Sequence, residues 1–111
     1  MNKQNLGNTV SMLNALAQET RLKAFRSLMA AGHEGLAAGK LAESLGVAPN
    51  NLSVHLSVLS HAGLISVKRA GRFQIYSANI SAINTLLTSL VETCCGGHPD
   101  VCKLVNTLGC E

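Results

Sequence analysis

Residues 38–63 carry the strongest constraint on the fold, because they contain two short helical patterns separated by a turn. The first pattern has apolar residues on one helical face: Leu41, Ala42 and Leu45. Gly46 follows, where the end of a helix favours a residue in the left-handed conformation. Pro49 stands where a second helix can begin, because its fixed φ angle suits the first helical turn. The sequence therefore predicts two helices joined by a tight turn.

The second of these helices has one apolar and one polar face. Its core stripe, with spacings of four and three residues, is Leu52, Leu56 and Leu59. The side chains expected on the other face are short and mostly polar: Asn50, Asn51, Ser53, Val54, His55 and Ser57. Asn and Ser can bond to base edges, and Val can contact a thymine methyl group. We therefore expect a helix-turn-helix whose second helix enters the DNA major groove; a plain helical hairpin is the alternative.

A β-hairpin is predicted after the helix-turn-helix. Residues 64–69 and 72–77 resemble strands, and the pair Ala70-Gly71 between them is typical of a hairpin turn. The basic residues near its tip are Lys68, Arg69 and Arg72. In this position the hairpin would be the wing of a winged helix, and its tip would contact the sugar–phosphate backbone or the minor groove. A solvated turn that is basic by chance is the alternative.

The charge of the chain supports a polyanionic partner. The formal net charge is only +3, but no Asp or Glu occurs between Glu43 and Glu92. The three basic residues of the hairpin fall inside this window, together with the proposed DNA-reading helix. The local field would therefore favour double-stranded DNA.

The flanking segments predict a domain that completes its core as a dimer. Helical patterns occupy residues 9–17 and 20–31, and the region 80–93 is an amphipathic helix with no later helix large enough to cover its apolar stripe. We expect that helix and the first helix to pair with a second copy of the chain. The predicted organisation is a flexible start over 1–8, a DNA-binding and dimerisation domain over 9–93, and a cysteine-containing sensing tail over 94–111.

Other classes of protein receive no support from the sequence. No stretch has the length of a membrane span, and the first 30 residues lack the apolar block of a signal peptide, so a cytoplasmic location is expected. No Gly-rich phosphate loop, paired carboxylates or serine nucleophile motif appears, so we do not expect an enzyme.

The tail carries three closely spaced thiols, which are expected to be reduced in the cytoplasm: Cys94, Cys95 and Cys102. Three soft sulfur ligands complete the coordination of trivalent arsenic or antimony. Zinc would need a fourth ligand, for which His98, Cys110 or water are candidates. A thiol–disulfide switch between Cys102 and one of the vicinal pair, and a chance cluster, remain alternatives. Cys110 is otherwise expected to be a bystander, and no organic cofactor is predicted.

The chain resembles the ArsR-type family of metal-sensing repressors over roughly residues 15–77. The motifs that carry the resemblance are Thr20-Arg21-Leu22, Ser53-x-His55-Leu56, Leu59-x-x-Ala62-Gly63-Leu64 and the segment from Arg72 to Tyr76. The resemblance implies a homodimeric winged-helix repressor that binds an inverted-repeat operator and releases it when an inducer binds.

The position of the cysteines narrows the resemblance. Some arsenic sensors of the family carry a Cys-x-Cys pair near the helix before the recognition helix, but this chain has no cysteine before Cys94. The zinc sensors use Asp and His along the last long helix, and residues 80–93 contain neither. What remains resembles the subgroup with a Cys-Cys…Cys cluster after that helix, which responds to trivalent arsenic.

The sequence thus predicts a mainly α-helical, homodimeric winged helix-turn-helix with a small β-hairpin. The expected function is an arsenite-responsive repressor, with inorganic arsenic(III), and antimony(III) as a second inducer, bound by three thiolates. A zinc-responsive or other divalent-metal-responsive repressor and a thiol-redox repressor of the same fold are the alternatives. A protein that sequesters arsenic without regulatory DNA binding is a rival from another class.

Overall fold

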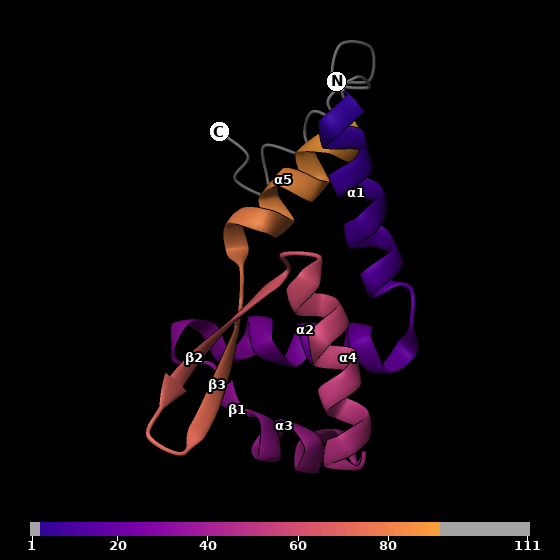
Figure 1. Ribbon diagram of the computed structural model, residues 1–111. Coiled ribbons are helices and arrows are strands. Elements are labelled where there is room, and N and C mark those ends of the chain that lie inside the picture. Colours follow the sequence, from indigo (N-terminus) through magenta and orange to yellow (C-terminus); the bar gives the residue numbers. More distant parts are fainter. Residues whose placement is uncertain (1–2, 92–111) are drawn as a thin grey trace.

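The computed structural model describes residues 3–91 of the 111-residue chain, and the expected cysteine tail lies outside this range. Figure 1 shows a helical body with a small sheet extending from one side of it. The elements in chain order are α1 (Lys3–Leu16), α2 (Glu19–Ala31), the 3-10 turn η1 (Gly32–Glu34), β1 (Leu36–Ala37), α3 (Ala38–Leu45), α4 (Pro49–His61), β2 (Ile65–Ala70), β3 (Phe73–Ala78) and α5 (Ile80–Val91). The predicted mainly α-helical fold with a small β element is confirmed.

The core lies between α2, α3, α4 and the sheet, with α1 and α5 packed together at one end of the molecule (Figure 1). Its largest fully buried side chains are all leucines: Leu28, Leu41, Leu52, Leu56, Leu59 and Leu64. The predicted stripe of α4 is therefore the part of that helix that joins the core. Burying the stripe fixes which side of α4 faces outward.

The turn between α3 and α4 has the predicted geometry. Gly46 adopts the left-handed conformation with φ 68° and ψ 32°, and its amide donates to the Glu43 carbonyl over 3.2 Å. The amide of Val47 donates to the Ala42 carbonyl over 3.1 Å, which closes the helix end. Pro49 is the first residue of α4. The geometry of the helix-turn-helix therefore follows from the local backbone preferences of Gly46 and Pro49, which the sequence analysis identified.

The sheet has a third strand that the sequence did not predict. Residues 33–39 were expected to be a loop, but β1 pairs antiparallel with β3 through Leu36 opposite Tyr76 and Ala37 opposite Ile75. The strand order is β1-β3-β2. A strand of two residues cannot show an alternating pattern, and its partner is about 40 residues away in the sequence. This pairing is therefore a tertiary feature.

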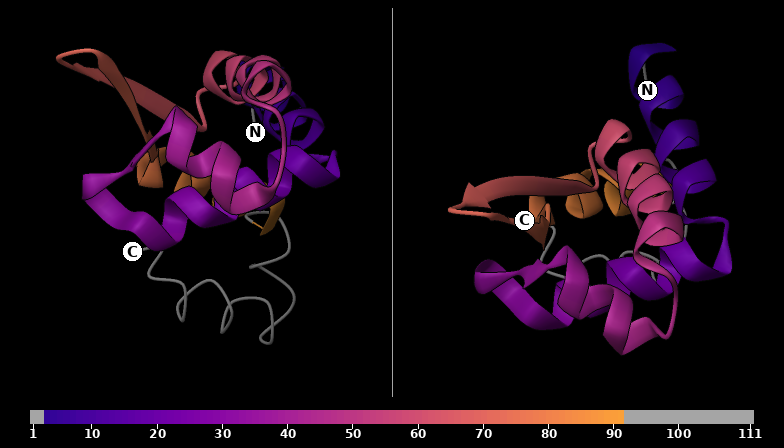
Figure 2. Two further views of the ribbon diagram at one scale, coloured as in Figure 1. Left: turned by 90° about the horizontal axis from the view of Figure 1, so that it is seen from below. Right: turned by 60° about the horizontal axis from the view of Figure 1, so that its bottom comes forward.

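The turn of the hairpin is displaced by one residue from its predicted position. The sequence favoured Ala70-Gly71 as the turn, but Ala70 pairs with Phe73, so Gly71 and Arg72 form the tip. Gly71 has φ +63°. A two-residue hairpin turn that needs a positive φ angle at its first residue favours glycine at that position. Figure 2 shows this hairpin extending away from the helical body. The shift places Arg72 at the tip.

The helix boundaries also differ at the N-terminus. Residues 3–8, expected to be a flexible start, form the first turns of α1, and α2 begins one residue early at Glu19. In the sequence, Leu6 precedes Val10 by one helical repeat, but the Asn and Gln residues around it obscured the pattern. The α5 helix begins at Ile80 as predicted and is described to Val91, so the last two predicted residues lie outside the described range.

The glycine before β1 gives the first testable prediction. Gly35 has φ +68°, and a Cβ atom there would overlap the carbonyl oxygen of Tyr76 on β3. We therefore expect Gly35→Ala to lower the free energy of unfolding by about 1–3 kcal/mol, measured by urea denaturation. Gly39→Ala is the matched control, since a Cβ atom at this α3 position meets nothing within 4 Å. The control should be neutral or stabilise by up to about 1 kcal/mol, and equal losses in both variants would contradict the packing argument.

Candidate nucleic-acid interface

The outer side of α4 presents the residues that the sequence predicted for DNA. The exposed members, here called the recognition face, are Asn50, Asn51, Ser53, Val54 and Ser57. Val54 is 65% exposed, whereas Leu52, Leu56 and Leu59 on the opposite side are at most 1% exposed. The helix contains no Asp, Glu, Lys or Arg. An exposed helix face with amide, hydroxyl and methyl groups but no charge has the chemistry needed to contact base edges.

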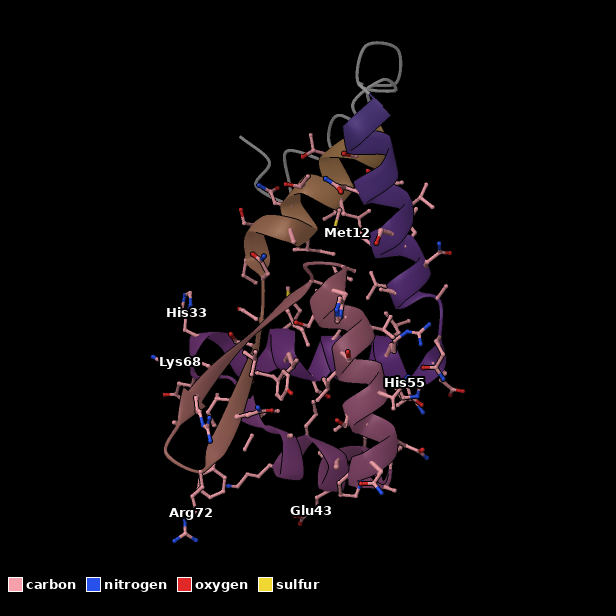
Figure 3. All side chains as sticks on the ribbon, in the orientation of Figure 1. Met12, His33, Glu43, His55, Lys68 and Arg72 are labelled. Carbon is pink, nitrogen blue, oxygen red and sulfur yellow. The ribbon has the colours of Figure 1, made fainter. Side chains whose placement is uncertain are left out.

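His55 differs from the rest of the predicted set. It is only partly exposed, and its Nδ1 atom lies 3.4 Å from a guanidinium nitrogen of Arg21 on α2. Figure 3 shows it on the side of α4 that faces the N-terminal helices. A contact between His55 and DNA would therefore use the other ring nitrogen, Nε2. The sequence could not show this, because Arg21 is 34 residues away.

The wing, defined as the β2–β3 hairpin over residues 65–78, carries the predicted basic side chains in exposed positions. Lys68 and Arg69 are neighbours on β2, so their side chains leave opposite faces of the sheet. Arg69 and Arg72 line a hollow of about 380 Å³ between the wing and the start of α3, and Lys68 does not line it. Arg72 extends from the tip of the wing (Figure 3). The wing thus offers two arginines on one side and a lysine on the other.

The structure adds residues near this hollow that the sequence analysis missed. Ala38 and Gly39, at the start of α3, line it together with Phe73 and Gln74 of the wing. Phe73 is 63% exposed. Backbone amides at the start of a helix are suited to a phosphate group. The sequence analysis could not show that these residues are neighbours, because their proximity depends on β1, which places the start of α3 beside the hairpin.

The charges in the described part of the chain are distributed unevenly. Over residues 3–91 the acidic side chains are Glu19, Glu34 and Glu43, and none belongs to α4 or the wing. Glu19 forms an ion pair of 3.2 Å with Lys23, so part of this small negative charge is neutralised. The surface formed by α4 and the wing therefore has a positive potential suited to a nucleic acid backbone.

The predicted metal ligands lie outside the described residues: Cys94, Cys95 and Cys102, as well as His98 and Cys110. Within residues 3–91, no group of three or more His, Cys, Asp or Glu side chains is placed to hold a metal ion. His61 belongs to α4, where its Nδ1 atom donates to the Ser57 carbonyl over 2.8 Å. In the same part of the chain, no helix is long and apolar enough to cross a membrane.

Comparisons with known proteins agree with this geometry. A helix-turn-helix domain model matches residues 16–68. A Halobacterium salinarum protein, named as an arsenical resistance operon repressor, ArsR, is 36% identical over 81 residues, which are 73% of this chain and 61% of that protein. The chain thus spans less than two thirds of that relative's length.

Two solved structures extend the similarity to the whole fold. An ArsR-like transcriptional regulator from Rhodococcus sp. RHA1 superposes with a TM-score of 0.71 at 23% identity and covers 94% of both chains. Mb0332 from Mycobacterium bovis, named as a homodimeric winged helix-turn-helix DNA-binding domain of a possible ArsR-family regulator, gives 0.65 at 27% identity and covers 84% of this chain and 82% of that one. The chain contains a helix-turn-helix domain and shares its fold with these ArsR-type regulators. The comparisons support the resemblance seen in its motifs, and they agree with the helix-turn-helix described above.

The wing gives the second prediction. Each phosphate contact contributes about 0.9 to the slope of log K against log salt concentration. Arg72→Ala should therefore flatten the slope by about one unit, measured by fluorescence anisotropy with duplex DNA. Arg26→Ala removes the same charge from α2, outside the proposed interface, and should leave the slope unchanged. An unaltered slope for Arg72→Ala would exclude the phosphate contact.

Proposed function

We propose that this chain is an ArsR-type transcriptional repressor, which binds operator DNA as a homodimer and is released when trivalent arsenic binds its cysteines. The observation that carries the DNA-binding part is the uncharged recognition face of α4 beside a basic wing, with no acidic side chain in either element. The cysteine part is carried by the composition of the tail and by the name of the Halobacterium salinarum relative.

The helix α4 and the wing would have different roles in DNA binding. Asn50, Asn51 and Ser53 occupy the first turns of α4, the part of a recognition helix that reaches base edges. Val54 offers a methyl group for thymine. The wing arginines would neutralise phosphates and set the register on the duplex without reading its sequence. Specificity is thus assigned to α4 and much of the affinity to the wing.

The homodimer would form through α1 and α5, which pack against each other within one chain (Figure 1). Large apolar side chains remain exposed on both helices: Val10 is 49%, Leu13 41%, Ile80 52% and Leu90 48% exposed. Only Leu86 of α5 is fully buried within the chain. A second copy would remove this apolar surface from water. The dimer would present two copies of α4 to half-sites about one helical turn apart.

The dimer interface gives the third prediction. Leu90→Glu places a charge in the proposed apolar contact and should weaken dimerisation by at least about 2 kcal/mol. Sedimentation equilibrium at micromolar concentration should then show monomers, where the unsubstituted chain shows dimers. Ser81→Glu adds the same charge to the polar side of α5 and should remain dimeric. A dimer that persists in Leu90→Glu would place the interface elsewhere.

The donor set of the tail fits trivalent arsenic. Cys94, Cys95 and Cys102 supply three thiolates, and arsenic(III) forms three bonds, so that no further ligand is required. Arsenic supplies a thiophilic, three-coordinate centre when bound. A methyl group on arsenic would leave only two bonds for sulfur, so the three-thiol set favours inorganic forms. A nearly complete switch from DNA-bound to free protein requires arsenic to bind the free state more tightly than the DNA-bound state by roughly 5 kcal/mol.

The structure offers a route from α5 to α4. Asn79 precedes α5, and its side-chain oxygen accepts from the Ala82 amide over 3.3 Å, which caps the helix. Its side-chain amide donates to the Gly63 carbonyl over 3.0 Å, and its backbone amide donates to the Leu64 carbonyl over 2.8 Å. Gly63 and Leu64 are the second and third residues after the end of α4. The last described residue of α5, Val91, is three positions before Cys94 in the sequence. A displacement of α5 on arsenic binding would therefore reach the end of α4.

The proposed inducer site gives the fourth prediction. Cys102→Ser removes one of three sulfur ligands, so it should retain operator affinity and lose release by arsenite, measured by anisotropy with labelled operator. Cys110→Ser is the matched control and should release normally. Release of Cys102→Ser by arsenite would overturn the three-thiol site. Release of the unsubstituted chain by zinc, or by peroxide in a manner that dithiothreitol reverses, would favour the divalent-metal or redox alternative.

A further inference from the structure

Two of the motifs that carry the family resemblance meet in the structure. Arg21 belongs to the Thr20-Arg21-Leu22 segment on α2, and His55 belongs to the Ser53-x-His55-Leu56 segment on α4. Their side chains approach to 3.4 Å between a terminal guanidinium nitrogen and Nδ1. Both residues are partly buried. The contact therefore joins the recognition helix to α2 at a shielded position.

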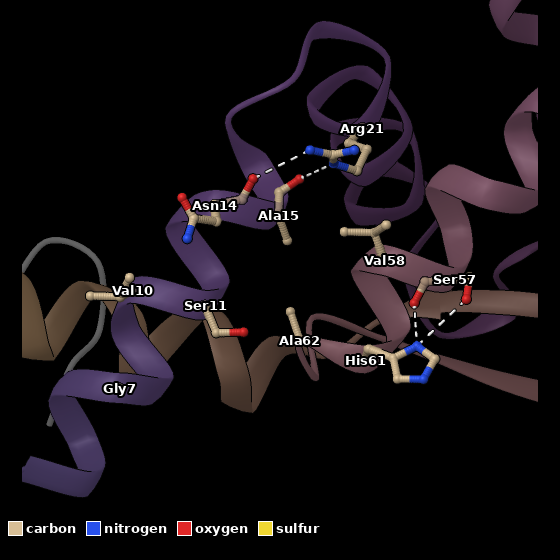
Figure 4. Close-up of a pocket in the computed structure, with 10 residues that line it drawn as sticks. All are labelled: Gly7, Val10, Ser11, Asn14, Ala15, Arg21, Ser57, Val58, His61 and Ala62. Carbon is tan, nitrogen blue, oxygen red and sulfur yellow. Dashed lines mark hydrogen bonds between the residues drawn. The ribbon is translucent and has the colours of Figure 1, made fainter.

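The same guanidinium holds the end of α1 (Figure 4). Its Nε atom donates to the Ala15 carbonyl over 2.7 Å, and its second terminal nitrogen donates to the Asn14 carbonyl over 3.4 Å. These carbonyls lie in the last turn of α1, where carbonyl groups carry partial negative charge, and that of Asn14 also accepts from the Ala17 amide over 3.2 Å. The Arg21 amide donates to Gln18 over 2.8 Å, which fixes the start of α2.

The chemistry of the contact sets its direction. An arginine has only donors, so Nδ1 of His55 must be the acceptor. One planar group thus uses separate N–H groups for the carbonyls of α1 and for the ring of α4. Lysine has a flexible stem and a point charge, and it cannot hold these acceptors in one fixed geometry.

We propose that Arg21 is a positioning residue, which fixes the recognition helix relative to the dimer helix α1 through His55. The inference rests on the proposed DNA-binding function. In the dimer, the angle between α1 and α4 sets the separation of the two recognition faces, and half-site spacing leaves little tolerance for error. Arg21 would therefore determine sequence-specific binding without touching DNA.

A groove beside this contact opens between α1 and α4. The groove has a volume of about 680 Å³ and lies between Val10 and Ser11 of α1 and Val58 and Ala62 of α4, with Arg21 among its lining residues (Figure 4). The polar contact at the Arg21 end is thus suited to set the relative orientation of the two helices.

The test compares Arg21→Met with the charge-matched Arg26→Met. Arg26 is an exposed arginine on the same helix, so both variants lose one positive charge from α2. The probes are a duplex selected from a random library by the unsubstituted chain and a scrambled duplex of equal length. We expect the ratio of selected to scrambled affinity to fall about tenfold in Arg21→Met and to stay unchanged in Arg26→Met. Equal ratios in the two variants would overturn the inference.

A double-mutant cycle separates positioning from simple loss of stability. Arg21→Met and His55→Leu should be non-additive in selected-duplex affinity by roughly fivefold. Additive effects would show that His55 acts on DNA by itself. Thermal melting checks that each variant is folded. If Arg21→Met does not fold, Arg21→Lys replaces it, and this lysine variant should also lose specificity. Full specificity in Arg21→Lys would overturn the role of the guanidinium.

The outcomes also distinguish this inference from the proposed function. If the unsubstituted chain selects no duplex, the DNA-binding proposal fails and the inference fails with it. If it selects one and Arg21→Met discriminates as well as Arg26→Met, only the positioning role is lost.

Discussion

The burial of three leucines on one side of α4 is the interaction on which the remaining structure depends. Leu52, Leu56 and Leu59 pack into a core shared with Leu28 of α2 and Leu41 of α3. Because a helix is rigid, burying one side determines what the other side presents to solvent. That other side carries amides and hydroxyls without charge, and its exposure makes these groups available for the proposed contacts with DNA. The core thereby orients the proposed DNA-reading surface without contributing a side chain to it.

Three regions of the molecule contact α4 or lead into it, and each serves a different part of the proposed function. At its start, α4 is joined through the turn at Gly46 to α3, whose N-terminus lies beside the wing arginines. At its far end, Gly63 and Leu64 bond to Asn79 and hence to α5. Near its middle, His55 faces Arg21 and the end of α1. The recognition helix is therefore held by polar contacts from the elements expected to dimerise and to respond to an inducer.

The predicted elements were accurate where the signal was local and wrong where it was not. The α3–α4 turn followed from a left-handed glycine and an N-terminal proline, both of which act within a few residues. The strand β1 was missed, because only its pairing with β3 makes two residues into a strand. The wing turn shifted by one residue, because cross-strand register and not composition selects which residues form the tip.

The sequence by itself determined the helix-turn-helix, the leucine stripe of α4, the absence of acidic residues between Glu43 and Glu92, and the family resemblance. These features arise from residue identity and spacing over short distances, where helical periodicity and turn chemistry operate. Only the tertiary structure decided that His55 faces Arg21, that Asn79 joins α5 to the end of α4, and that Arg69 and Arg72 lie beside the start of α3. Each of these contacts joins segments that are 16 or more residues apart, and their meeting depends on how the core packs.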